Sequence, residues 1–496
     1  MDTKFDVVIN NGRVIDPETN LDMVRHVGIS GGTITAVSAT PLTGEKVIDA
    51  TGLIVAPGYI DLHSHTQSIA GDRIQAFDGV TTVLELESGM MPIGMWYNDQ
   101  AEMGRALNYG ASVAWTFARV VEMNPEMGEP DGTLRYFQKA FGKPEWSTHV
   151  ATQQQVDGML QRIEQGLKEG GIGIGINNGY APGAGVQEMT EVCALAARYG
   201  VPTYTHVSFL GNVDPGSSFE GYLRLIGYAG ATGAHMHICH LNSTSLRDIR
   251  RCAEAVKAAQ AAGLKITVEA YPYGAGSTAI GASMFLDPEF RRRTGSDWSD
   301  IVVNATGEAI ASEERLRELQ KENAGDVVVW HFIHPETNPE HQALLDVSNL
   351  YPGGAVASDA MPWQMPDGSF LFDNVWPIPD EAVAHPRSAA TYARFISQYV
   401  KKLKRISLME AIEKCTLIPA QILEESTPQM KRKGRLQVGA DADVIVFDLD
   451  QVEDKATFKN STVPSTGMKY VFVNGTPLIS DGALDVDSLP GQPVRR

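Results

Sequence analysis

Apolar and polar positions in the central part of the chain follow two periodicities. Short apolar runs are typical of buried strands, and amphipathic runs such as 156–169, 187–199 and 246–262 are typical of helices. Strand-like runs occur at 58–65, 80–87, 111–117, 172–177, 202–208, 235–241, 266–273 and 355–359. Their alternation with helical runs predicts parallel βα units. Eight such strands predict an α/β fold of the (β/α)8 TIM barrel type.

The two ends of the chain have a different pattern. Residues 5–56 carry short β-rich runs separated by glycine turns, and residues 442–479 carry similar runs. Neither end has enough strands to bury a sheet face alone, so we expect the two ends to pair into one small β-sandwich. The predicted domains are 1–56 and 426–496, which form the sandwich, and 57–425, which forms the barrel.

Two long excursions interrupt the alternation. Residues 282–350 separate the last two predicted strands and include a charged helical run at 313–321, while residues 360–389 follow the last strand. Segments of this length in a compact domain usually cover or shape a site. We therefore expect 282–350 to form a lid or subdomain.

Composition narrows the classes of partner. A net charge of −19 over 496 residues argues against a nucleic-acid surface and against attraction to anionic membranes. The 4 cysteines are scattered without Cys-x-x-Cys spacing, which indicates neither a disulfide framework nor a cysteine zinc site. Neither a signal peptide nor an apolar stretch of about 18 residues is evident. We expect a cytoplasmic protein with no nucleic-acid or membrane partner.

The first predicted barrel strand ends in Asp61-Leu-His-Ser-His. Because side chains alternate along a strand, His63 and His65 point the same way. Imidazole nitrogens are common ligands of zinc and similar ions, so the pair is a candidate metal site. Two unrelated surface histidines are the alternative, and residues later in the chain weigh against it.

Polar residues at the ends of the other predicted strands complete a candidate metal set, because barrel active sites lie at the carboxyl ends of the strands. The candidates are His63, His65, Glu87, His206, His240 and Asp359. Taken singly, His206 or His240 would more often be a core histidine, but their shared position at strand ends favours ligands. Together the set would hold one or two divalent ions, with zinc expected. We expect His235 and His237 to be structural, and parity places His237 on the face opposite His240.

Two carboxylates lie on one face of the second predicted strand, Glu85 and Glu87. A buried unpaired carboxylate is costly, whereas one bound to a metal is compensated. Glu87 is nearer the catalytic end, so we predict that it bridges the metals and that Glu85 supports a histidine or a lysine. The reverse assignment stays open.

Asp359 combines two possible roles. It can ligate a metal through one oxygen and serve as the base that takes a proton from an activated water, then as the acid for the leaving nitrogen. The alternative is that Asp359 caps the N-terminus of a helix. We favour this alternative less, because Pro362 follows so soon.

Several motifs resemble those of the amidohydrolase superfamily, and most closely the N-acyl-D-amino-acid deacylases (D-aminoacylases). They are Ala56-Pro-Gly-Tyr-Ile-Asp-Leu-His-Ser-His, Ala270-Tyr-Pro-Tyr-Gly-Ala-Gly-Ser-Thr, His385-Pro-Arg and the tail from Lys433 to Val444. The segment His240-Leu-Asn-Ser-Thr-Ser also resembles dihydroorotases and hydantoinases. The resemblance implies the same barrel, the same histidine and aspartate ligands, and weak binding at one of two metal positions.

The chain departs from the family at the residue that bridges the two metals and at the residues that bind the substrate. Hydantoinase-like enzymes use a carboxylated lysine on the fourth strand, which 172–177 lacks, and D-aminoacylases use a cysteine where Ser88 stands here. Glu87 remains as the substitute. The family's carboxylate-binding lysine is replaced by Asn242, a weaker partner for a carboxylate. Tyr271 or Tyr273 could position the scissile carbonyl and Arg387 could supply the missing cation, or these could be structural residues.

The sequence thus predicts a metal-dependent hydrolase of the amide C–N bond of an N-acyl amino acid or a similar small amide, acting as a homo-oligomer. A cyclic amidase of the dihydroorotase or hydantoinase type is one alternative, and a non-catalytic scaffold of the same fold is another. The acyl group, the chirality of the substrate and the identity of the metal do not follow from the sequence.

Overall fold

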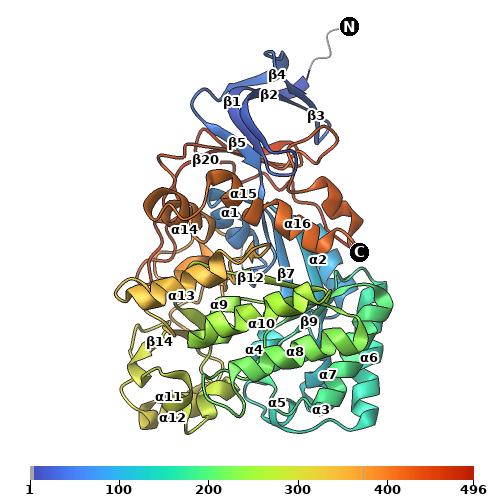
Figure 1. Cartoon of the computed structure of the whole chain (residues 1–496), viewed down its shortest axis with the longest axis vertical. Helices are drawn as coiled ribbons and strands as arrows, with labels where there is room; N and C mark the ends of the chain where they lie inside the picture. Colours follow the sequence, from blue (N-terminus) through green and yellow to red (C-terminus); the bar gives the residue numbers. More distant parts are fainter. Residues whose placement is uncertain (1–4, 373) are drawn as a thin grey trace.

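The computed structural model describes residues 5–372 and 374–496. Residues 1–4, at the predicted start of the first domain, and residue 373, within the predicted excursion 360–389, lie outside the described residues. A domain of strands lies at one end of the molecule, the barrel lies in the middle, and helices α11 (Phe290–Thr294) and α12 (Glu313–Glu322) lie at the opposite end (Figure 1).

The barrel is an 8-stranded parallel sheet whose strand order follows the chain. Its strands are β6 (Tyr59–Asp61), β7 (Val80–Met90), β8 (Asn108–Ala114), β9 (Ile174–Ile176), β10 (Pro202–Thr205), β11 (His235–Ile238), β12 (Ile266–Ala270) and β16 (Ala355–Val356). Just beyond β6 and β16, the amide of His65 donates to the carbonyl of Ala360 over 2.7 Å, which closes the ring. Every predicted barrel strand is present, and the predicted (β/α)8 barrel is confirmed.

Helices surround this sheet. The longer ones are α1 (Ile69–Phe77), α2 (Ile93–Met103), α3 (Trp115–Met123), α6 (Gln153–Lys168), α7 (Val186–Tyr199), α8 (Ser218–Thr232), α10 (Ile249–Ala261), α13 (Pro339–Asn349) and α15 (Leu408–Cys415). Shorter ones are α4 (Leu134–Ala140), α5 (Glu145–Thr148), α9 (Leu241–Ser245), α14 (Tyr392–Phe395) and α16 (Leu417–Leu423). The third predicted strand, 111–117, was too long at its end, because Trp115 already begins α3.

Strands from both ends of the chain form one 9-stranded sheet, which confirms the predicted β domain. They are β1 (Phe5–Asp16), β2 (Leu21–Ser30), β3 (Thr33–Ser38), β4 (Gly44–Asp49), β5 (Ile54–Pro57), β17 (Val444–Phe447), β18 (Met468–Val473), β19 (Thr476–Ser480) and β20 (Ala483–Leu484). The two ends join where β5 pairs antiparallel with β17.

Strand β17 is buried on both faces of this sheet. Val444 and Val446 pack into the core of the β domain, whereas Ile445 and Phe447 pack with barrel residues such as Phe395. Because successive side chains point to opposite faces of a strand, an unbroken apolar run can fill two cores at once. The β domain is therefore packed directly onto the barrel.

The long excursion before β16 contains a small sheet of its own. Strand β15 (Val327–Trp330) lies between β13 (Gly276–Ala279) and β14 (Ile301–Val303) and pairs antiparallel with both. The structured insertion thus begins at Gly276, shortly before the predicted 282. Within the described residues, no helix combines the length and the apolar character needed to cross a membrane.

Asp78 links three segments of the fold. It caps the end of α1, accepts hydrogen bonds from the amides of Tyr392 (2.7 Å) and Ala393 (2.9 Å) at the start of α14, and accepts a third from the hydroxyl of Ser465 (2.8 Å). Burial raises the pKa of Asp78 to about 7, although these hydrogen bonds act to lower it.

This raised pKa predicts a pH dependence of stability. Since the folded pKa lies above the ordinary value near 4, Asp78 contributes stability that is full below about pH 4 and is lost as the pH rises through 7. Between pH 5 and pH 8 this contribution falls by about 2–3 kcal/mol. We expect the Asp78→Asn variant to lose less stability than the unmodified protein over that range in urea denaturation. Equal losses of stability in the two proteins would show that Asp78 is not the source of this pH dependence.

Candidate metal centre

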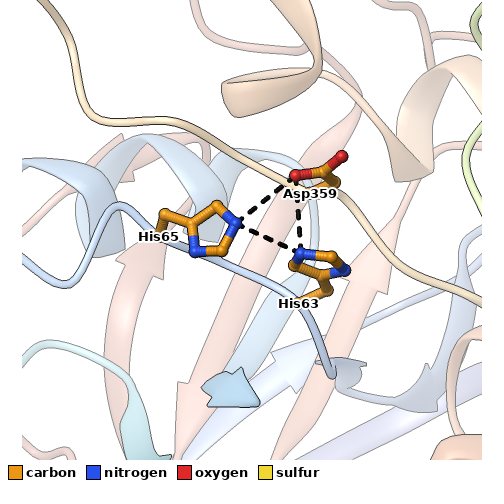
Figure 2. Close-up of side chains that lie close together, drawn as sticks. All are labelled: His63, His65 and Asp359. Carbon is orange, nitrogen blue, oxygen red and sulfur yellow. Dashed lines mark hydrogen bonds and ion pairs between the residues drawn. The ribbon is translucent and has the colours of Figure 1, made fainter. Parts of the chain in front are cut away.

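The candidate ligands predicted from the sequence lie together at the carboxyl ends of the barrel strands. They are His63 and His65 after β6, Glu87 on β7, His206 after β10, His240 after β11 and Asp359 after β16. The side chains of His63 and His65, from one segment, and of Asp359, from another, point toward one another (Figure 2). This convergence is what the barrel prediction requires.

The spacing of the first three ligand atoms fits a small divalent ion. His63 Nε2 lies 3.2 Å from His65 Nε2, and Asp359 Oδ1 lies 3.4 Å and 3.5 Å from these two nitrogens. Ligands at about 2.0–2.1 Å from a tetrahedral zinc lie about 3.3 Å from one another. The donor set and its dimensions therefore fit zinc.

Glu87 lies between two pairs of histidines. Its Oε1 is 2.7 Å from His240 Nε2 and 3.0 Å from His206 Nδ1, while its Oε2 is 3.4 Å from His63 Nε2 and 3.7 Å from His65 Nε2. Each carboxylate oxygen thus faces a different pair. The bridging role expected of Glu87 from the sequence stays a prediction.

Carboxylates behind the first pair fix the orientation of the imidazoles. His63 Nδ1 lies 2.6 Å from Glu269 Oε1, and His65 Nδ1 lies 2.7 Å from Glu85 Oε2. When Nδ1 donates to a carboxylate, the lone pair of Nε2 is left to face a metal. The contact of Glu85 with a histidine is the one predicted from the sequence.

His237 departs from the predicted geometry. Parity placed it on the face opposite His240, but its Nε2 lies 3.1 Å from Glu269 Oε2, in the network that holds His63. The parity argument fails because β11 ends at Ile238, and His240 has a left-handed φ of 34° that redirects its side chain. Asp359 also has a left-handed φ, of 51°. Backbone strain of this kind is concentrated at functional sites.

The charges of the cluster suit a cation. Burial acts to raise the pKa of Glu87, but three surrounding imidazoles, led by that of His63, hold the pKa well below its usual value. Burial lowers the pKa of His206, which favours the neutral imidazole that a metal requires. An anionic carboxylate among imidazoles can both ligate an ion and offset its charge.

Asp359 has a second partner besides the histidines. Its Oδ2 lies 2.9 Å from Arg387 Nη2, and both side chains are buried. Burial acts to raise the pKa of Asp359, but the Arg387 guanidinium and the surrounding imidazoles together hold the pKa below its usual value. Asp359 is therefore ionised at neutral pH, with one oxygen toward the histidines and the other toward an arginine.

Of the predicted substrate-binding residues, the structure brings Tyr271 to the open space beside the cluster. Arg387 lies next to it, with its guanidinium 4.6 Å from the centre of the Tyr271 ring. Asn242 and Tyr273 are placed differently. The Asn242 amide donates to the carbonyls of Tyr271 and Tyr273, and the Tyr273 hydroxyl donates to the carbonyl of Ala390. Their donor groups thus hold the loop after β12 in place.

Two residues of the site were missed in the sequence. Glu269 lies in the buried strand β12, where the argument that a buried carboxylate needs a partner would have found it. Asn177, just after β9, donates to Glu87 Oε2 over 3.1 Å and accepts from the Thr116 hydroxyl over 3.0 Å. It occupies the strand that carries the carboxylated lysine in hydantoinase-like enzymes, but an asparagine at a strand end gives no signal of its own.

An open cavity adjoins the cluster. Its lining includes His65, Glu87, His206, His240 and Asp359, together with Tyr180 and Tyr271. The Tyr180 ring packs 4.7 Å from the ring of His206. A concave, largely apolar cavity with a few polar groups at one end is typical of a small-molecule site, and the ligand cluster lies at its polar end.

Comparisons with known proteins agree with this site. The model of the amidohydrolase family matches residues 46–322 and 242–479, which confirms the superfamily resemblance of the motifs. Among curated proteins, the N-acyl-D-glutamate deacylase of Alcaligenes xylosoxydans xylosoxydans is 26% identical over 100% of this chain and 98% of its own. The D-aminoacylase of the same organism is 26% identical over 97% of this chain and 95% of its own.

Among solved structures, the N-acyl-D-glutamate deacylase of Bordetella bronchiseptica, in complex with zinc and a phosphonate inhibitor, matches with a TM-score of 0.77. It is 20% identical to this chain, with coverage of 99% of this chain and 100% of the other. A D-hydantoinase from Thermus sp. matches with a TM-score of 0.58 at 18% identity, over 99% of both chains. These likenesses support the same barrel and β domain.

Proposed function

The chain belongs to the amidohydrolase family, and from this premise we propose that it is a metal-dependent enzyme that hydrolyses the amide C–N bond of an N-acyl amino acid. The observation that carries the proposal is the position of Asp359, which lies between the imidazoles of His63 and His65 on one side and Arg387 on the other. A carboxylate placed in this way can serve a metal and move a proton.

Six side chains would hold the metal in this proposal: His63, His65, Glu87, His206, His240 and Asp359. A divalent ion supplies a Lewis acid for the carbonyl and lowers the pKa of an attacking water toward 7. Asp359 accepts the proton of this water at its carboxylate and delivers it to the leaving nitrogen. Arg387 keeps Asp359 ionised until that step. Glu85 and Glu269 hold the imidazoles of His65 and His63 in position throughout.

Recognition of the amino-acid carboxylate is assigned to Tyr271 and Arg387. The Tyr271 hydroxyl and Arg387 Nη1 are both buried without a hydrogen-bond partner among the described residues. Gly276 lines the cavity, and a Cβ at this glycine would lie 3.3 Å from the Tyr271 hydroxyl and 3.8 Å from Arg387 Nη1, so the missing side chain leaves space beside both donors. Burial raises the pKa of Tyr271 to about 12, which keeps the hydroxyl protonated as a donor.

Relatives support an N-acyl amino acid over a ring substrate. Curated deacylases match nearly the whole chain. A dihydroorotase of Solibacter usitatus is 46% identical, but only over 88 residues, which are 16% of this chain, and one of Geobacillus thermodenitrificans covers 92% of this chain at 24% identity, slightly below the 26% of the two deacylases. The cyclic amidase remains the second candidate, because hydantoinases share the fold.

A substrate panel tests the proposal. The zinc-loaded protein is assayed with both enantiomers of several N-acetyl amino acids and with hydantoin, dihydrouracil and dihydroorotate. We expect hydrolysis of N-acetyl amino acids with kcat/KM at least 100-fold above that for any ring. A preference for a ring would establish the cyclic amidase, and a protein without stoichiometric metal would establish the scaffold. The homo-oligomer and the cytoplasmic location expected from the sequence stay predictions.

A further inference from the structure

Aromatic rings lead away from the metal centre along one wall of the cavity. The Tyr180 ring contacts His206, and the rings of Phe137 and Phe141 lie 6.0 Å and 5.8 Å from Tyr180. All three aromatic residues line the cavity. Phe137 and Phe141 come from the segment around α4, which is a connection between barrel elements and takes no part in holding the ligands.

The insertion between β12 and β16 completes this wall. Met284, Trp330 and Phe332 line the same cavity, and the rings of Trp330 and Phe332 lie 6.2 Å apart. Trp330 and Phe332 belong to the hydrophobic core of the insertion, against which Met284 also packs. We call these six residues, Phe137, Phe141, Tyr180, Met284, Trp330 and Phe332, the apolar wall.

Three polar groups near the apolar wall are paired with the protein, whereas the Ser277 hydroxyl, which also lines the cavity, has no hydrogen-bond partner among the described residues and carries no charge. The Tyr180 hydroxyl lies 2.9 Å from the Thr278 hydroxyl, the Gln138 amide donates to the carbonyl of Gly325, and the Trp330 indole donates to the Ser296 hydroxyl. No lysine or arginine is among the described residues that line the cavity. The nearby Arg387 is engaged with Asp359 and, in the proposed function, with the carboxylate of the amino acid.

We infer that the enzyme selects N-acyl amino acids whose side chain is apolar and excludes those with an acidic side chain. This inference rests on the proposed function and specifies its substrate class. An apolar side chain against the apolar wall gains the free energy of leaving water. A second carboxylate there would lose its hydration without meeting a cation, which is strongly unfavourable. The curated relative that is named for D-glutamate would therefore differ from this chain in specificity.

The first test compares side chains at constant acyl group. The zinc-loaded protein is assayed with the N-acetyl derivatives of leucine, methionine and phenylalanine and of glutamate and aspartate, in both enantiomers. We expect kcat/KM for the best apolar substrate to exceed that for the best acidic one by at least 100-fold. An enzyme that hydrolyses acidic substrates equally well or better would overturn the inference and leave the proposed function standing.

The second test places a cation in the apolar wall. Met284 is half-buried and unbranched, so lysine can replace it with similar length. Met284→Lys should lower the ratio of kcat/KM for the best apolar substrate to kcat/KM for N-acetylglutamate at least tenfold, mainly through faster hydrolysis of N-acetylglutamate. Met284→Gln is the matched control, with similar length and no charge, and should not accelerate the acidic substrate. If both variants respond alike, charge at the wall is not the determinant.

A binding measurement separates this inference from the proposed function. Calorimetry with N-acetyl-leucine and N-acetylglutamate on the zinc-loaded Asp359→Asn variant, in which turnover is expected to be slow, reads the apolar wall. Tighter binding of the leucine derivative to this variant, with no hydrolysis of either compound by the unmodified protein, would refute the proposed function and support the apolar wall. Equal or tighter binding of the glutamate derivative would refute the apolar wall.

Discussion

The Asp359→Asn variant is expected to lose at least about 10³-fold in kcat, because general acid–base catalysis by a positioned side chain contributes about 10²–10⁴-fold and Asp359 also faces two metal-binding imidazoles. Asparagine keeps the shape of the side chain but cannot accept a proton at neutral pH. The measurement is kcat with an N-acetyl amino acid at saturating zinc, together with zinc content and the thermal unfolding midpoint.

A second aspartate provides a matched control. Asp454 has the same side-chain exposure as Asp359, 11%, and also pairs with an arginine, Arg394 at 3.1 Å, but it does not line the cavity. Asp454→Asn should keep kcat within about twofold, since substitutions away from a site mostly affect stability. Full activity in Asp359→Asn would rule out its role as the proton carrier.

Parity and strand order were sufficient to predict much of this site. His63 and His65 lie two residues apart at the end of a strand, so the shared direction of their side chains follows from strand geometry. The eight-unit alternation then places β7, β10, β11 and β16 in one ring, and it brings Glu87, His206 and Asp359 together although they are far apart in sequence.

Residues beyond the strand ends were less predictable, because their direction depends on backbone angles that periodicity does not encode. His240 turns through a left-handed conformation, and Asn242 follows in a short helix, where its amide supports the loop of Tyr271 and Tyr273. The apolar wall likewise joins segments that share no hydrophobic periodicity. Phe137, Tyr180 and Phe332 meet only because separate loops fold over the same strand ends.

Glu87 is the predicted bridging ligand, and its replacement should have the second large effect. Since Oε1 faces His240 and His206 while Oε2 faces His63 and His65, Glu87→Gln removes the negative charge between both pairs. We expect zinc to bind at least 100-fold more weakly and kcat/KM to fall at least 100-fold at limiting zinc. For comparison, loss of a residue that only supports a metal ligand lowers metal affinity or activity about 10–100-fold.

Glu85 supplies the comparison that decides between the two carboxylates of β7. It contacts His65 at Nδ1, away from the proposed metal, and its other oxygen accepts from the Ser88 amide, so Glu85→Gln should weaken zinc binding less than Glu87→Gln does. Zinc affinity is measured by competition with a chromophoric chelator, and the ratio of the two losses is the readout. If zinc affinity falls more in Glu85→Gln than in Glu87→Gln, the bridging role belongs to Glu85.

Because Asn177 donates to Glu87 Oε2, the Glu87→Gln variant also turns this contact into one between an amide donor and an uncharged partner. If Glu87 bridges the metals, its role should depend on charge as well as on position, which a variant of equal size tests directly.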